Sequence, residues 1–205
     1  MASPLRRPLP ERRDQLVRHF VETIEPLLEH GATYAGLSVE QIIRAGGISR
    51  ASFYGYFRDK GDLLQALAQD VNQEIAVGGD AWWGITDETV TLEQLREGLR
   101  PAVDAYLRHT VLVRAVAEAS AYDANVRGVY VELMSGTIAR LAAHIEGRQQ
   151  RGLIAADLDA SRTATWLVWM LERGLYQAVS VSDAADVETW LDSVTRIVWS
   201  SLYRS

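Results

Sequence analysis

Residues 37–64 read LSVEQIIRAGGISRASFYGYFRDKGDLL, and this stretch carries the clearest structural signals in the chain. The Ser38–Gln41 segment has the pattern of a capping box, which begins a short helix that we expect to end near Ala45. The Gly46–Gly47 pair then makes a turn, and Ser49 can cap a second helix of about two turns. Two short helices joined by a glycine-containing turn predict a helix-turn-helix.

The two faces of this segment differ in chemistry. Its apolar side chains suffice for a three-helix core with the preceding helix, and they are Val39, Ile42, Ile43, Ile48, Phe53 and Phe57. The second helix begins with Ser49, Arg50, Ala51 and Ser52, which are small or polar enough for the helix to approach a DNA duplex and contact phosphates and base edges. Tyr54 and Tyr56 lie off the Phe53/Phe57 stripe, and their hydroxyls can donate to phosphates, although Tyr56 fits a core position equally well.

Charge is distributed unevenly along the chain. The whole sequence has a formal net charge of −6, but residues 1–61 hold nine Lys and Arg against seven Asp and Glu. The remaining residues hold 12 against 20. Lys60 is the only lysine, and it stands at the start of the next helix, where the helix dipole also favours an anion. This asymmetry indicates a small anion-binding segment attached to an acidic body.

The run from Leu37 to Leu64 resembles the N-terminal signature of the TetR family of regulators, with its glycine-containing turn, its Tyr-x-x-Phe and its Lys followed by a Leu pair. Gly46 stands where alanine is usual in that family. The resemblance implies that Arg50 and Ser52 contact base edges and that Ser38, Tyr54 and Lys60 contact phosphates. The full set of predicted DNA-binding residues is Ser38, Ser49, Arg50, Ser52, Tyr54, Tyr56 and Lys60.

Helical spacing of apolar residues predicts further helices at 12–30, 62–75, 91–109, 111–122, 125–150, 159–180 and 186–203, with Gly78–Gly79 in a loop after the fourth helix. No segment alternates with period two, so the predicted fold is all-α with about nine helices. We expect a flexible arm at 1–10, a three-helix helix-turn-helix DNA-binding domain at 11–61, and a helical ligand-binding and dimerisation domain at 62–205.

The body is rich in aromatic residues, with six Trp and eight Tyr in the whole chain, and some of them are expected to line a pocket. Its C-terminal pattern, at residues 171–176 (LERGLY) and 199–203 (WSSLY), resembles the TetR subgroup that includes the mycobacterial regulator of ethionamide activation. This resemblance implies a long hydrophobic channel. Candidates for the inward faces of the body helices are Leu95, Tyr106, Tyr130, Met134, Thr137, Leu141, Val168 and Leu171. For each of them ordinary core packing remains an alternative. An apolar lining with few charges would select a small lipophilic molecule.

The last two helices carry apolar residues on more than one stripe, which is more than a surface helix requires. We therefore predict a twofold homodimer interface that includes Trp166, Trp169, Trp190, Val194 and Ile197. A twofold dimer also presents two recognition helices to a palindromic operator. Glu172 and Arg173 are interpreted as a structural pair rather than as catalytic groups.

Several function classes lack their required residues. The chain has no cysteine, its four histidines are scattered, and no glycine-rich phosphate loop or Ser/His/Asp arrangement is recognisable. No cofactor, metal site or enzymatic activity is therefore expected. No apolar run approaches the ~20 residues of a membrane span, so we expect a cytoplasmic protein without a membrane partner.

These observations predict a DNA-binding transcriptional regulator, specifically a repressor that a small lipophilic ligand releases from its operator. The alternative is a helix-turn-helix regulator whose body only dimerises or binds a protein partner. For the ligand-released repressor, the expected mechanism is a ligand-dependent shift of the fourth helix that changes the separation of the two DNA-binding domains in the dimer.

Overall fold

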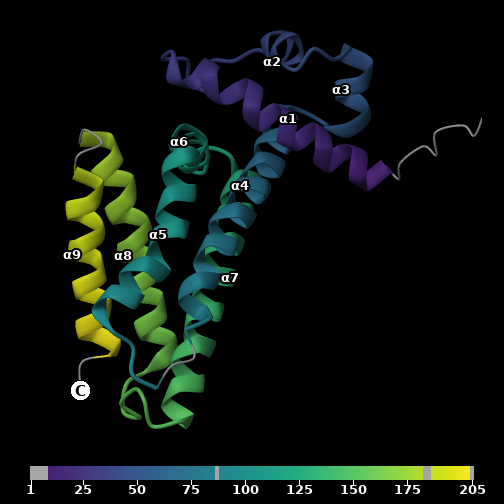
Figure 1. The fold of residues 1–205 in the computed structure, drawn as a ribbon. Helices are drawn as coiled ribbons and strands as arrows, with labels where there is room; N and C mark the ends of the chain where they lie inside the picture. The colour runs from purple at the N-terminus through teal and green to yellow at the C-terminus, as the bar shows by residue number, and fades with distance from the viewer. Residues whose placement is uncertain (1–8, 86–87, 182–185, 204–205) are drawn as a thin grey trace, which may run out of the picture. The chain divides into compact units, whose positions relative to one another are not determined.

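The structure is a computed structural model and describes residues 9–85, 88–181 and 186–203. Within these residues the regular secondary structure is entirely helical (Figure 1). The helices are α1 (Leu9–Glu29), α2 (Val39–Ala45), α3 (Arg50–Tyr56), α4 (Lys60–Trp83), α5 (Leu92–Arg108), α6 (Thr110–Ala119), α7 (Ala124–Gln150), α8 (Ala160–Val181) and α9 (Asp186–Leu202). The predicted all-α class with about nine helices is confirmed for the described residues.

The chain forms two compact units. Unit 1 takes the residues up to 70 together with 111–130, and unit 2 takes 71–110 together with the residues from 131 onward. The segment 111–130, which contains α6 except for its first residue, therefore groups with the N-terminal residues, although it lies within the predicted body. The helix α4 contributes residues to both units.

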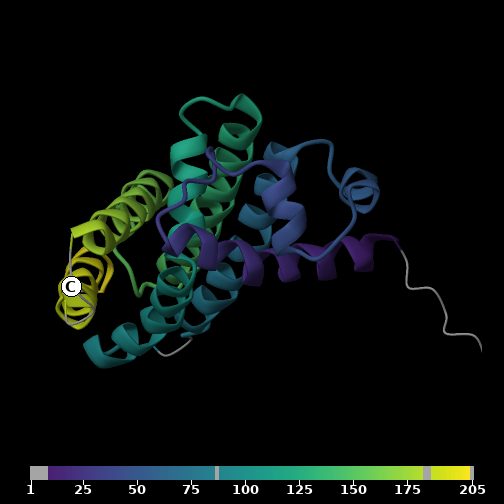
Figure 2. The ribbon, with the colours of Figure 1, turned by 90° about the horizontal axis from the view of Figure 1, so that it is seen from above.

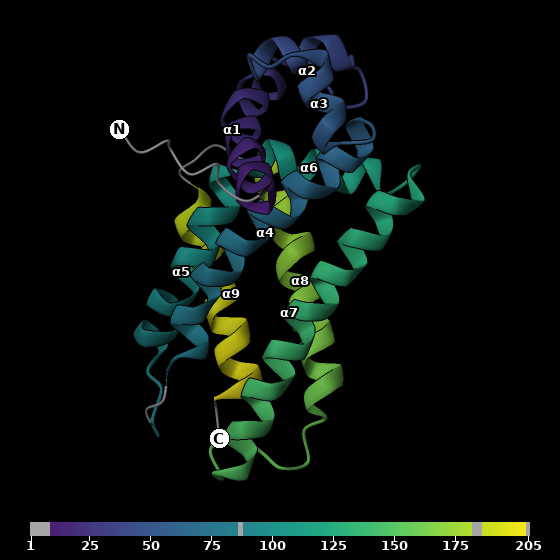
Figure 3. The same cartoon turned by 90° about the vertical axis from the view of Figure 1, so that its right-hand side faces the viewer.

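In unit 1, α1 packs against α2 and α2 against α3 (Figure 3). The core is centred on the ring of Phe20 in α1, whose centroid lies 6.4 Å from that of Phe53 and 6.0 Å from that of Phe57. Ile24 and Ile42 are also completely buried. The three-helix core predicted from the sequence is present, and the edge-on arrangement of its rings is the favourable one for aromatic pairs.

The helix α1 begins at Leu9, earlier than the predicted start at Arg12. Pro10 falls in its first turn, where the missing N–H has no intrahelical partner to lose. The predicted flexible arm at 1–10 is therefore wrong for residues 9 and 10, which are helical. Residues 1–8 lie outside the described residues.

The prediction that α4 ends near Ile75 is also wrong, because the helix continues through Gly78 and Gly79 to Trp83. The sequence predicts a loop at these glycines because glycine disfavours a helix interior. A Cβ atom at Gly78 would lie 2.7 Å from the backbone of Pro101 in α5, so the glycine permits a close approach of the two helices in unit 2. The loss of helix propensity at this position is offset by packing.

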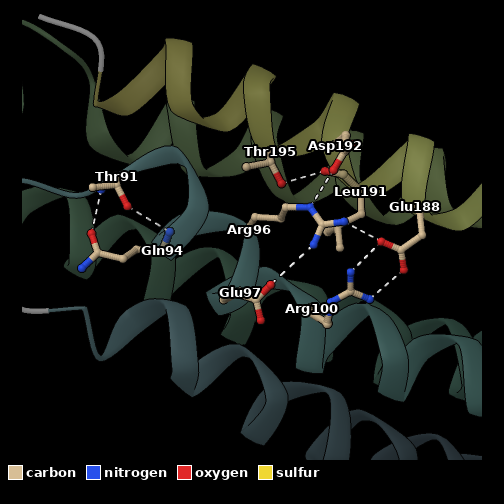
Figure 4. A network of polar contacts seen from close by, with 9 residues as sticks. All are labelled: Thr91, Gln94, Arg96, Glu97, Arg100, Glu188, Leu191, Asp192 and Thr195. Carbon is tan, nitrogen blue, oxygen red and sulfur yellow. Dashed lines mark hydrogen bonds and ion pairs between the residues drawn. The ribbon is translucent and has the colours of Figure 1, made fainter.

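In unit 2, α9 packs against both α5 and α8, and α8 and α9 run next to each other in two views (Figures 1 and 2). The predicted capping box at Thr91 is present and begins α5. On the outside, Arg96 Nε donates to Asp192 at 2.6 Å, and Arg96 and Arg100 both donate to Glu188 (Figure 4). The hydrogen bonds that Glu188 accepts lower its pKa to about 2, with the larger effect from Arg100 and the smaller one from Arg96. The network joins α5 to α9.

No helix among the described residues is long and apolar enough to cross a membrane.

Candidate nucleic-acid interface

The first helix of the helix-turn-helix, α2, starts at a complete capping box. Ser38 Oγ accepts the backbone N–H of Gln41 at 3.2 Å, and the Gln41 side chain accepts the backbone N–H of Ser38 at 2.8 Å. The Ser38 side chain is thus held at the surface by local bonds. Its hydroxyl proton is not used in the cap, because the oxygen is the acceptor. The predicted phosphate contact at Ser38 requires only that proton.

The turn to α3 consists of Gly46, Gly47 and Ile48. Gly47 has φ +61°, a left-handed conformation that favours glycine. The next residue, Ser49, caps α3 by accepting the backbone N–H of Ser52 at 3.1 Å. The turn and the cap together fix where α3 begins, as the sequence predicted.

The outward face of α3 is polar and its inward face is aromatic. Phe53 and Phe57 are buried, as predicted, whereas Tyr54 is 46% exposed. Arg50 is also exposed, and Ser52 and Tyr56 are half-buried. The predicted division of this helix into a core stripe and a solvent-facing stripe is therefore confirmed for Phe53, Phe57 and Tyr54.

Arg50 already has partners in the protein. Its Nη1 donates to the carboxylate of Glu40 on α2, and its guanidinium lies 5.4 Å from the centre of the Tyr54 ring. The pKa of Glu40 lies below its ordinary value, mainly because its own backbone N–H donates to the carboxylate and additionally because Arg50 does. Glu40 was not among the predicted site residues. It lies ten residues before Arg50, and only the fold brings the two together.

Lys60 is anchored to the loop before α2. Its Nζ donates to the carbonyl of Ala35 at 2.6 Å and to that of Leu37 at 3.0 Å. In return, Tyr34 Oη donates to the carbonyl of Lys60 at 2.6 Å. Burial raises the pKa of Tyr34, so the phenol stays protonated and keeps this bond. The sequence predicts that the ammonium group contacts a phosphate. It predicts neither the two bonds of Lys60 Nζ to carbonyls nor the bond from Tyr34.

The predicted ligand-binding residues are distributed over three helices. Leu95 and Tyr106 on α5, Leu141 on α7 and Val168 on α8 are buried. The other four are half-buried, and they are Tyr130, Met134, Thr137 and Leu171. Seven of the eight belong to unit 2, whereas Tyr130 belongs to unit 1.

The predicted dimer residues differ from one another in solvent exposure. Trp166 on α8 is 78% exposed, and Ile197 on α9 is also exposed. Trp169 and Trp190 are half-buried. Val194 is only 5% exposed, because it faces the interior of unit 2, so it offers little surface to a partner.

Two polar groups of unit 2, one half-buried and one buried, were not predicted as site residues. Tyr203 Oη accepts the indole N–H of Trp82 at 2.9 Å and lies 2.9 Å from His144 Nε2. Burial, and then the neighbouring charge of Arg148, lower the pKa of His144 to about 4. The second group is Glu172, which is 7% exposed and lies 3.9 Å from Arg173 Nε. The predicted Glu172–Arg173 pair therefore exists only at the distance limit of an ion pair.

Comparison with known proteins places these features in a family. The model of bacterial regulatory proteins of the tetR family matches residues 28–67, and the model of the C-terminal domain of transcriptional regulator EthR matches residues 95–204. The HTH-type transcriptional regulator EthR of Mycobacterium tuberculosis is 28% identical over 185 residues, which cover 90% of this chain and 85% of EthR. Transcriptional regulator AcuR of Cereibacter sphaeroides is 27% identical over 153 residues, which cover 71% of this chain and 68% of AcuR.

Solved structures agree with this assignment at the level of the fold. Regulatory protein TetR from Rhodobacter sphaeroides superposes with a TM-score of 0.68 at 24% identity, covering 95% of this chain and all of the other. A TetR-family regulator from Rhodococcus sp. gives a TM-score of 0.72 at 17% identity, with the same coverage. Together with the helix-turn-helix geometry, these matches show that the chain belongs to the TetR family of DNA-binding transcriptional regulators and is of the EthR type.

Proposed function

We propose that this regulator is a repressor that binds a palindromic operator as a homodimer and leaves it when a small lipophilic effector binds the body. The observation that supports the first part best is the outward face of α3, which presents Arg50 and Tyr54 to solvent while Phe53 anchors the helix in the core. A recognition helix needs that combination of a fixed position and a polar start.

The individual DNA contacts follow from this orientation. We assign base edges to Arg50 and Ser52, because they stand in the first turn of α3. Phosphate contacts are assigned to the hydroxyl and ammonium groups around this turn, namely Ser38, Ser49, Tyr54, Tyr56 and Lys60. Since Lys60 Nζ uses two of its three protons on carbonyls, one proton is left for an anion.

A homodimer is proposed because a palindromic operator requires two recognition helices related by a twofold axis. The exposed side chains of α8 and α9 support this arrangement, since Trp166 and Ile197 are large apolar residues on the surface of their own chain. Trp169 and Trp190, both half-buried, extend the same apolar surface. Val194 is only 5% exposed and would add little area to the interface.

The effector is proposed to act through α4. Its apolar contacts would come from α5, α7 and α8 of unit 2, where Leu95, Leu141 and Val168 face inward. The helix α4 has residues in both units, so a change in its position within unit 2 is carried along the helix. The effector shifts the equilibrium only if it binds the DNA-free arrangement more tightly than the DNA-bound one.

The DNA-binding half of the proposal is tested by selecting bound sequences from a random duplex library and measuring affinities by fluorescence anisotropy. We expect a palindromic site, and we expect Arg50→Ala and Tyr54→Ala each to weaken binding by about tenfold or more. Arg151→Ala, at an exposed arginine of unit 2 just after α7, serves as the control and should bind as the wild type does. If no sequence is enriched over random DNA, the operator proposal is wrong.

The release half is tested with the selected duplex and a library of lipophilic compounds. A specific effector should raise the melting temperature of the free protein in proportion to its excess and should lower the affinity for the operator. Compounds that stabilise the protein and leave operator binding unchanged would contradict release. In that case the body would only dimerise or bind a protein partner.

A further inference from the structure

The helix α8 carries a carboxylate on its buried stripe. The buried residues of this helix recur at helical spacing, and they are Ala160, Ala164, Leu167, Val168, Glu172 and Leu175. Glu172 lies one turn after Val168 and two turns after Ala164. It therefore occupies a position where packing alone would select leucine, and it is only 7% exposed.

Neither carboxylate oxygen of Glu172 has a hydrogen-bond partner among the described residues. The closest cation is Arg173, whose Nε is 3.9 Å away and beyond hydrogen-bond distance. The Arg173 side chain is mostly exposed, and its guanidinium lies 5.1 Å from the centre of the Tyr176 ring. Adjacent residues of a helix do not face the same side, so this pair cannot satisfy the carboxylate from within the core.

One buried phenol, that of Tyr106, lies within electrostatic range of this carboxylate. Tyr106 of α5 is 6% exposed and belongs to the same unit. Its pKa is raised first by burial and then by the charge of Glu172, with a further contribution from Tyr176. The phenol of Tyr106 is therefore near enough to respond to the carboxylate. A buried carboxylate near a phenol suits an organic cation, because the carboxylate accepts the protons of the cation and an aromatic ring attracts positive charge.

We infer that Glu172 is the acceptor for a hydrogen-bond-donating, cationic group of the effector, so that the body selects lipophilic amines over alcohols and carboxylic acids. This inference rests on the proposed effector site and adds its chemical class. Buried polar atoms of native proteins nearly always have a hydrogen-bond partner. A ligand that supplies N–H donors would satisfy both oxygens of Glu172 at once. A carboxylic acid would instead place a second negative charge beside the first.

The inference is tested with octylamine, octan-1-ol and octanoate, which share one chain and differ only at the head group. Binding to the wild-type protein is measured by isothermal titration calorimetry at pH 7. We expect octylamine to bind about tenfold or more tightly than the alcohol, and octanoate to bind most weakly. This comparison needs no variant, so it stands even if a substitution at position 172 impairs folding.

Variants then locate the selectivity. Glu172→Gln should reduce the preference for the amine over the alcohol by about tenfold, whereas Glu132→Gln, at an exposed position of α7 in the same unit, should keep it. Glu172→Leu should raise the melting temperature of the free protein, because it removes an uncompensated buried carboxylate, and should abolish the preference.

Three outcomes overturn the inference: equal binding of the three probes, absence of binding by all of them, or an amine preference that survives in Glu172→Gln. Operator binding in the presence of each probe separates this failure from that of the proposed function. If the alcohol or the acid releases DNA as well as the amine does, the effector mechanism holds and the assignment of Glu172 fails. If the amine binds selectively but leaves DNA bound, the assignment holds and release fails.

Discussion

The phenolic oxygen of Tyr34 donates a hydrogen bond of 2.6 Å to the backbone carbonyl of Lys60, 26 residues further along the chain. Lys60 returns the contact through its side chain, which donates to the carbonyls of Ala35 and Leu37 in the loop before α2. The start of α4 and the loop before α2 are thus joined in both directions. This clamp fixes the position of Ser38, the residue that follows Leu37 and caps α2.

Replacing Tyr34 with phenylalanine tests the clamp. The ring stays in place but the buried carbonyl of Lys60 loses its donor, which should cost about 1 kcal/mol or somewhat more in the free energy of unfolding. Urea unfolding measures this cost, and DNA affinity should fall with it because Ser38 is held less firmly. Tyr122→Phe, at a tyrosine that is largely exposed, is the control and should change neither quantity. An unaltered stability in Tyr34→Phe would show that the bond contributes nothing.

Glu40 should oppose DNA binding. Its carboxylate holds Arg50 in the free protein and would face the phosphates in the complex. We expect Glu40→Gln to tighten operator binding by about three- to tenfold at low salt, with a smaller gain at high salt because the effect is electrostatic. Anisotropy titrations at several salt concentrations measure this. Glu118→Gln, at an exposed position of α6 in the same unit, provides a matched loss of one negative charge. Equal gains in both variants would mean that only net charge matters.

Gly46 should not tolerate the alanine that is usual in the family. A Cβ atom there would lie 2.3 Å from a ring carbon of Phe20, which is completely buried. We expect Gly46→Ala to destabilise the protein by about 1–3 kcal/mol through overpacking. Gly128 lies in α7, and a Cβ atom there would meet nothing within 4 Å. Because alanine has the higher helix propensity, Gly128→Ala should be neutral or stabilising by up to about 1 kcal/mol. Chemical denaturation of the two variants distinguishes them, and similar values would contradict the proposed clash.

Unit 2 should lose stability between pH 6.5 and pH 4 because of His144. Its folded pKa of about 4 lies below the ordinary value of 6.5, so the unfolded chain binds more protons in this window. Stability therefore falls as the pH is lowered through the window and levels off below it. Protonation would also remove the acceptor that Nε2 offers to Tyr203, whose oxygen already accepts the Trp82 N–H.

The measurement is the melting temperature as a function of pH. Since carboxylates titrate in the same range, the readout is the difference between the wild type and His144→Gln, which should decline less steeply. His30→Gln, at an exposed histidine of the loop after α1, is the control and should follow the wild-type curve. Parallel curves for all three proteins would exclude His144 as the source.

The exposed ring of Trp166 should belong to the proposed dimer interface. We expect Trp166→Glu to weaken the dimer by about 2 kcal/mol or more, a factor of roughly 30 in its dissociation constant, because an exposed tryptophan at an interface centre is a typical hot spot. Analytical ultracentrifugation over a range of concentrations measures this constant. The control is Tyr122→Glu, which places the same charge at an exposed aromatic position of unit 1. Unchanged assembly of Trp166→Glu would remove α8 from the interface.

Local patterns predicted the parts of the fold that depend on neighbours in sequence. The capping boxes at Ser38 and Thr91 are present, and Phe53 lies in the core, because caps and helical stripes need only three or four residues of context. The end of α4 was predicted wrongly, since Gly78 packs against Pro101 and no local pattern reveals a partner helix. The contacts of Arg50 with Glu40 and of Tyr34 with Lys60 could not be predicted for the same reason.

The anchored ammonium group of Lys60 makes the regulator a convenient subject for chemical labelling. Lys60 is the chain's single lysine, so an amine-reactive ester can acylate only two amino groups, that of Lys60 and that of the N-terminus. Its bonds to two carbonyls already slow that reaction, and a bound duplex would slow it further. The mass that one acylation adds to the protein, measured by mass spectrometry, can therefore report the fraction of regulator bound to its operator without an engineered tag.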